Sequence, residues 1–200
     1  MLILFSLLVI LFSVIIHEYL HGWMADYLGD PTARNAGRLT LNPFSHIDLW
    51  GSILMPAMIY LSTGGALCFG YAKPVPFNPH NLRDQKYGIA KVALAGPMAN
   101  FLTALSLGLL LYFFPHLSQN LIMLIKYIIQ INLVLFIFNL LPIPPLDGSK
   151  VIMSFLSFNL QKKMIELEHY GMFIVLLFIL FGFPLIVPII DTLFSLITGA

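Results

Sequence analysis

Three residues near the N-terminus have types and spacing suited to metal chemistry: His17, Glu18 and His21 form an HExxH motif. Two histidines four residues apart lie on one face of a helix, where both imidazoles can reach the same metal ion. Glu18 directly follows the first histidine, close enough to handle the proton of a metal-bound water. The motif therefore predicts a metal site, most simply a zinc site, with hydrolytic chemistry.

The segment that carries this motif is apolar on nearly every side. It runs from about Leu2 to about Leu28, and a membrane-spanning helix needs about 20 predominantly apolar residues. Ionisable side chains are costly to insert in such a helix, which makes them functional candidates by default. The segment has no basic N-terminal region and no small-residue cleavage site, so we expect a membrane span and not a signal peptide.

The composition agrees with an integral, multi-pass membrane protein. Of 200 residues, 59% are hydrophobic and 10% are charged, with a mean hydropathy of +0.91. A soluble domain is nearer a quarter charged. The net charge of +1 gives no case for nucleic-acid binding. The single cysteine, Cys68, cannot form an internal disulfide, and we interpret it as an apolar bystander.

A catalytic zinc site has three protein ligands and one open position, so a third ligand must come from elsewhere in the chain. Asp147 is the only acid between Asp84 and Glu166, and it follows prolines that interrupt an apolar segment. Two neutral imidazoles and one carboxylate would leave a zinc site of net charge +1, which lowers the pKa of bound water toward 7. Asp147 is therefore the candidate third ligand. The remaining histidines fall in loops or at segment ends: His46, His80, His116 and His169.

Four further apolar segments follow the first one. Segment 49–69 is interrupted by Pro56 and two glycines, so we expect either a kinked span or a partly re-entrant hairpin. Segment 170–197 contains two prolines and could be one kinked span. The other two, 87–114 and 120–141, read as ordinary spans.

The connecting segments have their own patterns. Alternation over 36–46 suggests a short extended piece in which Asn42 and His46 cap the loop. The proline-rich stretch 70–79 reads as extended, and either pairs with a substrate backbone or serves as a rigid connector. Residues 150–168 read as an amphipathic interfacial helix.

We therefore expect an all-α polytopic membrane protein with about four to six transmembrane or re-entrant segments, a three-helix catalytic core and short extended loop pieces. The chain forms one domain, 1–200, with the catalytic core at about 1–150 and the amphipathic helix and final span at about 150–200. Asn100 and Asn132 are polar groups in apolar segments and need partners. The simplest role of Asn100 is to join helices by hydrogen bonds, whereas Asn132 needs a packed or hydrated face.

Three stretches together resemble the site-2 protease family of intramembrane zinc metalloproteases (peptidase M50-like), in its short form without a PDZ domain. The resemblance covers about residues 10 to 150. HExxH paired with a late Leu-Asp-Gly is highly specific for this family. The three stretches are His17-Glu18-Tyr19-Leu20-His21, Ala95-Gly96-Pro97-Met98-Ala99-Asn100 and Asn139-Leu140-Leu141-Pro142-Ile143-Pro144-Pro145-Leu146-Asp147-Gly148.

The resemblance implies one zinc ion per chain, held by His17, His21 and Asp147, with Glu18 as general base. It implies hydrolysis of peptide bonds in or near the transmembrane segments of membrane-protein substrates. It also implies that Asn139 positions the substrate or stabilises the oxyanion. Asn100 is a further polar contributor to catalysis on the same basis.

The expected surroundings are the lipid bilayer and a transmembrane protein substrate, in the plasma membrane of a prokaryote. If segment 49–69 re-enters, the basic clusters can all lie on one side, which the positive-inside rule makes cytoplasmic. The active site would then lie nearer the cytoplasmic face. The alternative function is a membrane zinc-binding or zinc-transport protein, although transport gives Glu18 no specific role and the chain shows no paired repeat. The sequence does not set an oligomeric state.

Overall fold

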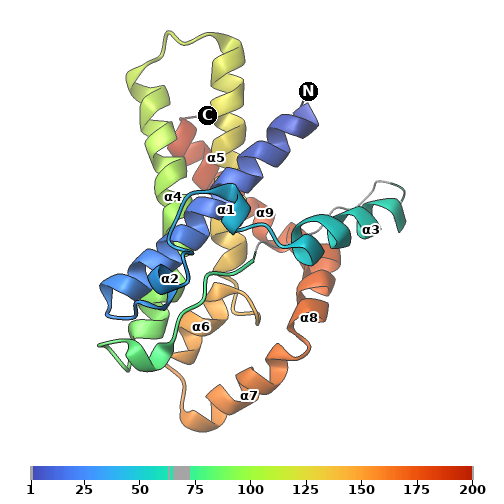
Figure 1. Ribbon diagram of the computed structural model, residues 1–200. Coiled ribbons are helices and arrows are strands. Elements are labelled where there is room, and N and C mark those ends of the chain that lie inside the picture. Colours follow the sequence, from blue (N-terminus) through green and yellow to red (C-terminus); the bar gives the residue numbers. More distant parts are fainter. Residues whose placement is uncertain (1, 63, 65–72, 200) are drawn as a thin grey trace.

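The computed structural model describes residues 2–62, 64 and 73–199, and every regular element in these ranges is helical (Figure 1). Four helical stretches are long and apolar enough to cross a membrane. This confirms the predicted all-α polytopic fold. The four are α1 (Leu2–Tyr27), α4 (Gly88–Phe113), α5 (Gln119–Asn139) and the stretch Gly171–Thr198, which comprises α8 (Gly171–Leu177), a π-helical turn (Phe178–Gly182) and α9 (Phe183–Thr198).

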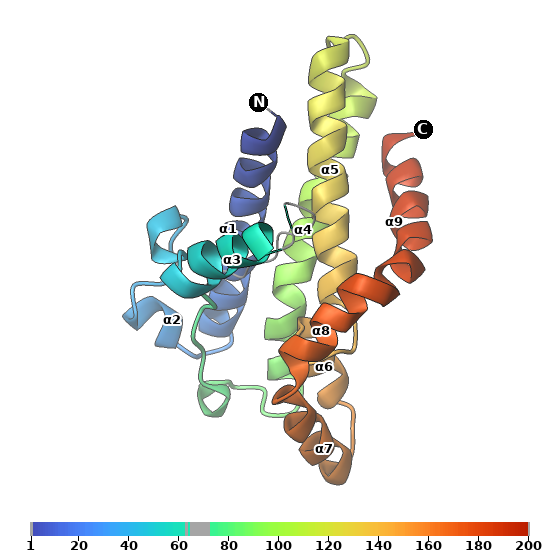
Figure 2. The ribbon, with the colours of Figure 1, turned by 90° about the vertical axis from the view of Figure 1, so that its right-hand side faces the viewer.

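Helix α4 is the centre of the bundle and packs against α1, α5 and α9 (Figures 1 and 2). Small residues along α4 allow these close approaches, as is usual where lipid replaces water around helices. At Gly108, for example, an added Cβ would lie 2.3 Å from Cγ2 of Ile197 on α9. One apolar cluster joins α4, α5 and α9. It contains Ala104, Ile125, Ile129, Leu133, Ile186 and Ile190.

The chain leaves the bundle after α1 and returns to the same end before α4. The backbone N–H of Arg83 donates to the carbonyl of Leu28 at 2.8 Å, and Ala25, Leu82 and Val92 form a second buried cluster there. The described residues on both sides of the intervening segment therefore lie at the same end of the bundle. This favours the re-entrant alternative for residues 49–69 over a single kinked span.

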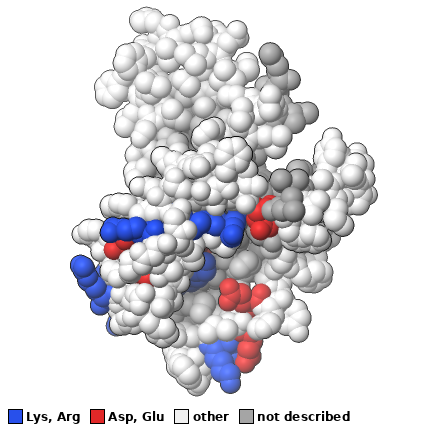
Figure 3. Space-filling view, viewed as in Figure 1, with Lys and Arg blue, Asp and Glu red and all other residues white. Residues whose placement is uncertain are grey.

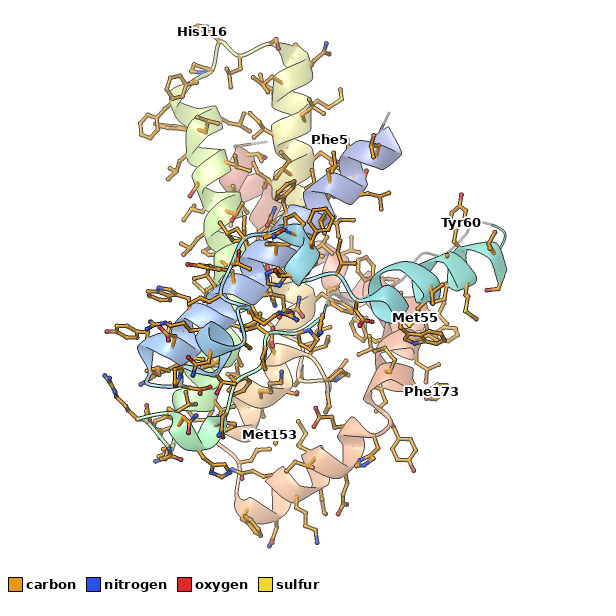
Figure 4. The ribbon with its side chains drawn as sticks, viewed as in Figure 1. Phe5, Met55, Tyr60, His116, Met153 and Phe173 are labelled. Atoms are coloured by element: carbon orange, nitrogen blue, oxygen red, sulfur yellow. The ribbon has the colours of Figure 1, made fainter. Side chains whose placement is uncertain are left out.

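The described part of that segment is too short to span a bilayer. It consists of a π-helical turn (Leu49–Leu54) and α3 (Met55–Ser62), and α3 points away from the bundle, as the labelled Met55 and Tyr60 show in Figure 4. A span needs about 20 residues. Cys68 and the first part of the predicted extended stretch 70–79 lie outside the described residues.

The predicted amphipathic helix 150–168 is wrong as a single element, because the structure has two helices there. These are α6 (Asp147–Met153) and α7 (Phe158–Glu168). The side-chain amide of Gln161 on α7 donates to the carbonyls of Met153 and Leu156, which satisfies backbone acceptors left open at the break. The break lets the start of α6 reach into the bundle while α7 lies outside it.

The predicted extended piece at 36–46 is not a strand. The chain forms α2 (Thr32–Asn35) and a 3-10 turn (Pro43–Ser45) in this region. The predicted caps are confirmed. The side-chain oxygen of Asn42 accepts from the N–H of Phe44, and Nε2 of His46 donates to the carbonyl of Thr40.

Candidate metal centre

The structure brings together the three predicted metal ligands, His17, His21 and Asp147. His17 and His21 lie on one face of α1, and Asp147 is the first residue of α6. The Nε2 atoms of the two histidines are 3.0 Å apart, and each is 3.1 Å from Oδ2 of Asp147. Among the described residues these three form the one cluster of side chains that could hold a metal ion.

The turn that follows α5 places Asp147 beside the two histidines. After α5 ends at Asn139, prolines prevent further helix, and the chain turns into α6 within a few residues. The turn is tight, since a Cβ added to Gly148 would lie 2.2 Å from the carbonyl oxygen of Leu140. Only glycine permits this contact, so the Leu-Asp-Gly sequence places the carboxylate against α1.

The Nδ1 atom of each imidazole forms a hydrogen bond on the side of the ring away from the metal site. Nδ1–H of His17 donates to Oδ1 of Asn100 on α4 at 2.7 Å, and Nδ1–H of His21 donates to the carbonyl of Val92 at 2.7 Å. A neutral imidazole that donates through Nδ1 presents a lone pair at Nε2. Two such lone pairs and the Asp147 carboxylate therefore converge on one point, where they repel each other unless a cation lies between them.

The donor set fits zinc. Ligand atoms about 2.0 Å from a tetrahedral zinc ion lie about 3.3 Å apart, close to the separations of 3.0 to 3.1 Å seen here. Hydrogen bonds to the far side of ligating histidines are the usual second layer of such sites.

Asn100 is the centre of a buried hydrogen-bond network between helices. Its Nδ2 donates to Oδ1 of Asn132 on α5 at 3.0 Å and to the carbonyl of Ser13 at 3.3 Å. Asn132 in turn donates to the carbonyl of Ile128. Both asparagines are fully buried, and each is a hydrogen-bond partner of the other, as polar groups in apolar segments require. Asn100 thus lies behind His17 and fixes the orientation of its ring.

Gly96 allows α4 to lie directly over the metal ligands. A Cβ at this position would be 2.3 Å from Nε2 of His21 and 2.7 Å from Nε2 of His17. Any larger residue would occupy the space in which the two lone pairs converge. The small-residue stretch around Gly96 therefore serves the site as well as helix packing.

Glu18 is anchored by an extended segment that crosses the site. Its Oε2 accepts from the backbone N–H of Val75 at 2.9 Å. The segment is held in turn by the N–H of Lys73, which donates to the carbonyl of His46, and by Arg38, which donates to the carbonyl of Lys73. Prolines lack an N–H, so residues 73–76 have no backbone donor left for a substrate strand. This arrangement favours the rigid-connector alternative for 73–76.

A small cavity of about 60 Å³ lies between this segment and the metal ligands. It has room for a few water molecules but not for a peptide segment. Glu18, His21 and Asp147 share its wall with Lys150, whose Nζ is 3.7 Å from Oδ1 of Asp147. The remaining lining residues are Pro74, Val75, Phe77, Val92 and Ala93.

Asn139 does not line this cavity. Its side-chain amide donates to the carbonyl of Leu135 on its own helix at 2.9 Å. A direct contact of Asn139 with substrate stays a prediction, for which its second amide N–H is available. The other histidines are not part of the metal-ligand cluster, and His116 lies at the far tip of the α4–α5 turn (Figure 4).

Sequence reasoning missed several parts of the site. Lys150 could have been noted from the sequence, because it lies three residues after the candidate ligand. Gly96 could also have been noted, because it lies in one of the three stretches that carry the family resemblance. The N–H of Val75 and the carbonyl of Val92 are main-chain groups, which no residue type reveals.

Comparisons with known proteins agree with this site. Residues 115–182 match the profile described as Peptidase family M50. "Putative zinc metalloprotease YwhC" of Bacillus subtilis is 37% identical over 90% of this chain and 81% of its own length. "Putative zinc metalloprotease Rip2" of Mycolicibacterium smegmatis is 30% identical over 85% of this chain, and "Putative zinc metalloprotease Rip2" of Mycobacterium tuberculosis is 30% identical over 84% of it; the match covers 64% of each Rip2 protein. No solved structure matches the chain.

Proposed function

This chain belongs to peptidase family M50 and is a zinc metallopeptidase, and from that premise we propose that it cleaves membrane-protein substrates within or beside the bilayer. One observation carries the proposal. The cluster of His17, His21 and Asp147 is built on helices that are long and apolar enough to span a membrane. A hydrolytic site on such helices meets peptide bonds that soluble peptidases cannot reach.

The depth of the site supports this proposal. Gly96, which lies against both histidines, is eight residues after the start of α4, or about 12 Å along the helix. The other end of α4 is about 25 Å away. The site therefore lies inside the apolar bundle and nearer to the end from which α6 and α7 emerge.

The charge distribution supports an orientation with that end in the cytoplasm. In Figure 3 the charged side chains gather on the lower part of the molecule, and the upper part shows none. The α4–α5 connection, 114–118, contains no lysine or arginine. The positive-inside rule then supports a cytoplasmic lower end, and we propose that the membrane is the plasma membrane of a prokaryote. The basic residues of the lower connections and the adjoining turn of α4 are Arg34, Arg38, Lys73, Arg83, Lys86, Lys91, Lys150, Lys162 and Lys163.

In this proposal His17, His21 and Asp147 hold one zinc ion per chain. When bound, zinc lowers the pKa of a water molecule toward 7 and polarises a carbonyl group. Glu18 takes the proton of the attacking water and delivers it to the leaving amine nitrogen. The N–H of Val75 donates to Oε2 of Glu18 and orients the carboxylate for this proton transfer.

The substrate class follows from the setting of the site. A substrate helix must unwind locally to present a peptide bond, and the cavity of about 60 Å³ must widen to admit it. A single-span membrane protein with a helix-breaking residue near the cytoplasmic end of its span is the substrate that we propose.

The test compares wild-type protein with Glu18→Gln, both zinc-loaded and reconstituted with a panel of labelled single-span proteins. We expect Glu18→Gln to keep its zinc and to lose cleavage by at least 10²-fold. The absence of cleavage by wild type across the panel would overturn the proposed substrate class. Cleavage by the variant at the wild-type rate would remove Glu18 as the base. Zinc flux through both proteins without cleavage would point to the transport alternative.

A further inference from the structure

Hydrolysis of a peptide bond places negative charge on the carbonyl oxygen, and preorganised donors or cations stabilise that charge. The family resemblance assigns this task to Asn139. In the structure, however, the amide of Asn139 is bonded to the carbonyl of Leu135 and is absent from the cavity wall. The groups that line the cavity beside the metal ligands are therefore the first candidates to face the reacting carbonyl.

Lys150 has the required position. Of the residues that line the cavity it is the one lysine or arginine, and it shares the cavity wall with Glu18, His21 and Asp147. Its side chain is 37% exposed and that of Asp147 is 10% exposed, so Lys150 is the more accessible member of the pair. The short helix α6 fixes this placement, because Lys150 follows Asp147 by less than one turn.

The two oxygens of Asp147 have different neighbours. Oδ2 faces the two imidazoles at 3.1 Å, whereas Oδ1 faces Nζ of Lys150 at 3.7 Å. A separation of 3.7 Å is an ion pair but is too long for a hydrogen bond. The ammonium has no hydrogen-bond acceptor among the described residues, so its N–H groups remain available to a ligand in the cavity.

We propose that the ammonium of Lys150 stabilises the oxyanion formed on the scissile carbonyl, an inference that rests on the proposed peptidase function. The water oxygen bonds to the carbonyl carbon, its proton passes to Glu18, and the electron pair of the C=O bond moves to the carbonyl oxygen. That pair returns when the C–N bond breaks and the nitrogen takes the proton from Glu18. Lys150 transfers no proton and contributes positive charge beside the oxygen.

The experiment uses full-length zinc-loaded protein and three variants: Lys150→Met, Lys150→Arg and, as a matched control, Lys162→Met on the exposed face of α7. We expect Lys150→Met to lower kcat about 10²-fold, the cost of one lost oxyanion donor, with KM nearly unchanged. Lys150→Arg should recover most of kcat. Lys162→Met should behave as wild type.

A second measurement does not require cleavage. A peptide phosphinate carries a tetrahedral anion that copies the reacting centre, so its affinity follows transition-state binding. Lys150→Met should weaken phosphinate binding by about the same factor as kcat/KM. Zinc affinity, measured by chelator competition, and the visible spectrum of the cobalt-substituted protein should match wild type.

The outcomes separate the two proposals. If Lys150→Met keeps wild-type kcat and phosphinate affinity, the Lys150 inference is overturned and the peptidase function stands. If zinc affinity falls together with kcat, Lys150 only orients Asp147, and the inference is again overturned. If wild type cleaves no single-span protein but phosphinate binding still depends on Lys150, the proposed substrate class fails and the Lys150 inference stands.

Discussion

Replacing Asn100 with leucine removes the acceptor that holds the ring of His17, and we expect zinc affinity to fall 10- to 100-fold. Asn100 is fully buried, and its Oδ1 is 2.7 Å from Nδ1 of His17. Leucine has the same branching and the same number of side-chain heavy atoms, so the change removes the hydrogen bonds of Asn100 to His17, Ser13 and Asn132 without opening a cavity.

The magnitude follows from the burial of both partners. A buried donor left without an acceptor costs about 1–3 kcal/mol, because no water replaces the lost bond. When Nε2 holds zinc the ring of His17 cannot turn to another partner, so we expect this penalty to fall mainly on the zinc-bound state. One to two factors of ten correspond to about 1.4–2.8 kcal/mol, which is also the usual effect of losing such an outer partner.

Asn100→Asp is the matched control. Its carboxylate still accepts from His17, but it no longer donates to Asn132 or to the carbonyl of Ser13. We expect this variant to unfold more easily while keeping zinc affinity close to wild type. The two variants therefore separate an effect on the metal ligand from an effect on helix packing.

The assay is competition for zinc with a chromophoric chelator in detergent, with thermal unfolding of the metal-free protein measured beside it. Two results would refute the reasoning. One is wild-type zinc affinity in Asn100→Leu. The other is an equal loss of affinity in both variants, which would show that the network acts through packing alone.

Two further predictions concern other parts of the chain. Gly96→Ala should abolish or strongly reduce zinc binding, since the added Cβ would lie 2.3 Å from Nε2 of His21; zinc content of the purified variant checks this, and wild-type content would contradict it. Asp30 is buried, which raises the pKa of its carboxyl, but hydrogen bonds from Thr32, Asn81 and the N–H of Asn78 outweigh this and lower it. The resulting stability should be complete above the unfolded pKa of about 3.9 and should disappear as pH falls through the lower folded value. Asp30→Asn should cost about 2 kcal/mol at neutral pH, because an amide N–H would face the N–H of Asn78, and should flatten this acid dependence in unfolding curves; an unchanged dependence would show that another group is responsible.

The local pattern of apolar residues was sufficient to predict much of the fold. The spans at 2–28, 87–114 and 120–141 match α1, α4 and α5 closely, because the bilayer demands a minimum apolar length and the chain supplies it locally. The single helix expected at 150–168 failed for the opposite reason. Gln161 on α7 donates to the carbonyls of Met153 and Leu156 at the break, and helical periodicity does not encode such a contact.

The candidate site likewise has parts that the sequence predicted and parts that only the tertiary structure shows. The spacing of His17 and His21 determined that both rings face one point, and the proline break before Asp147 marked the remaining acid at membrane depth. Only the tertiary structure decided that Asn100 supports His17 from behind, that Val75 holds Glu18 and that Lys150 faces the cavity where Asn139 was expected. These contacts join α1, α4, α5 and α6, and they depend on the rotation of each helix about its axis. That rotation is set by how closely Gly96 and Gly108 let neighbouring helices approach, which no single segment determines alone.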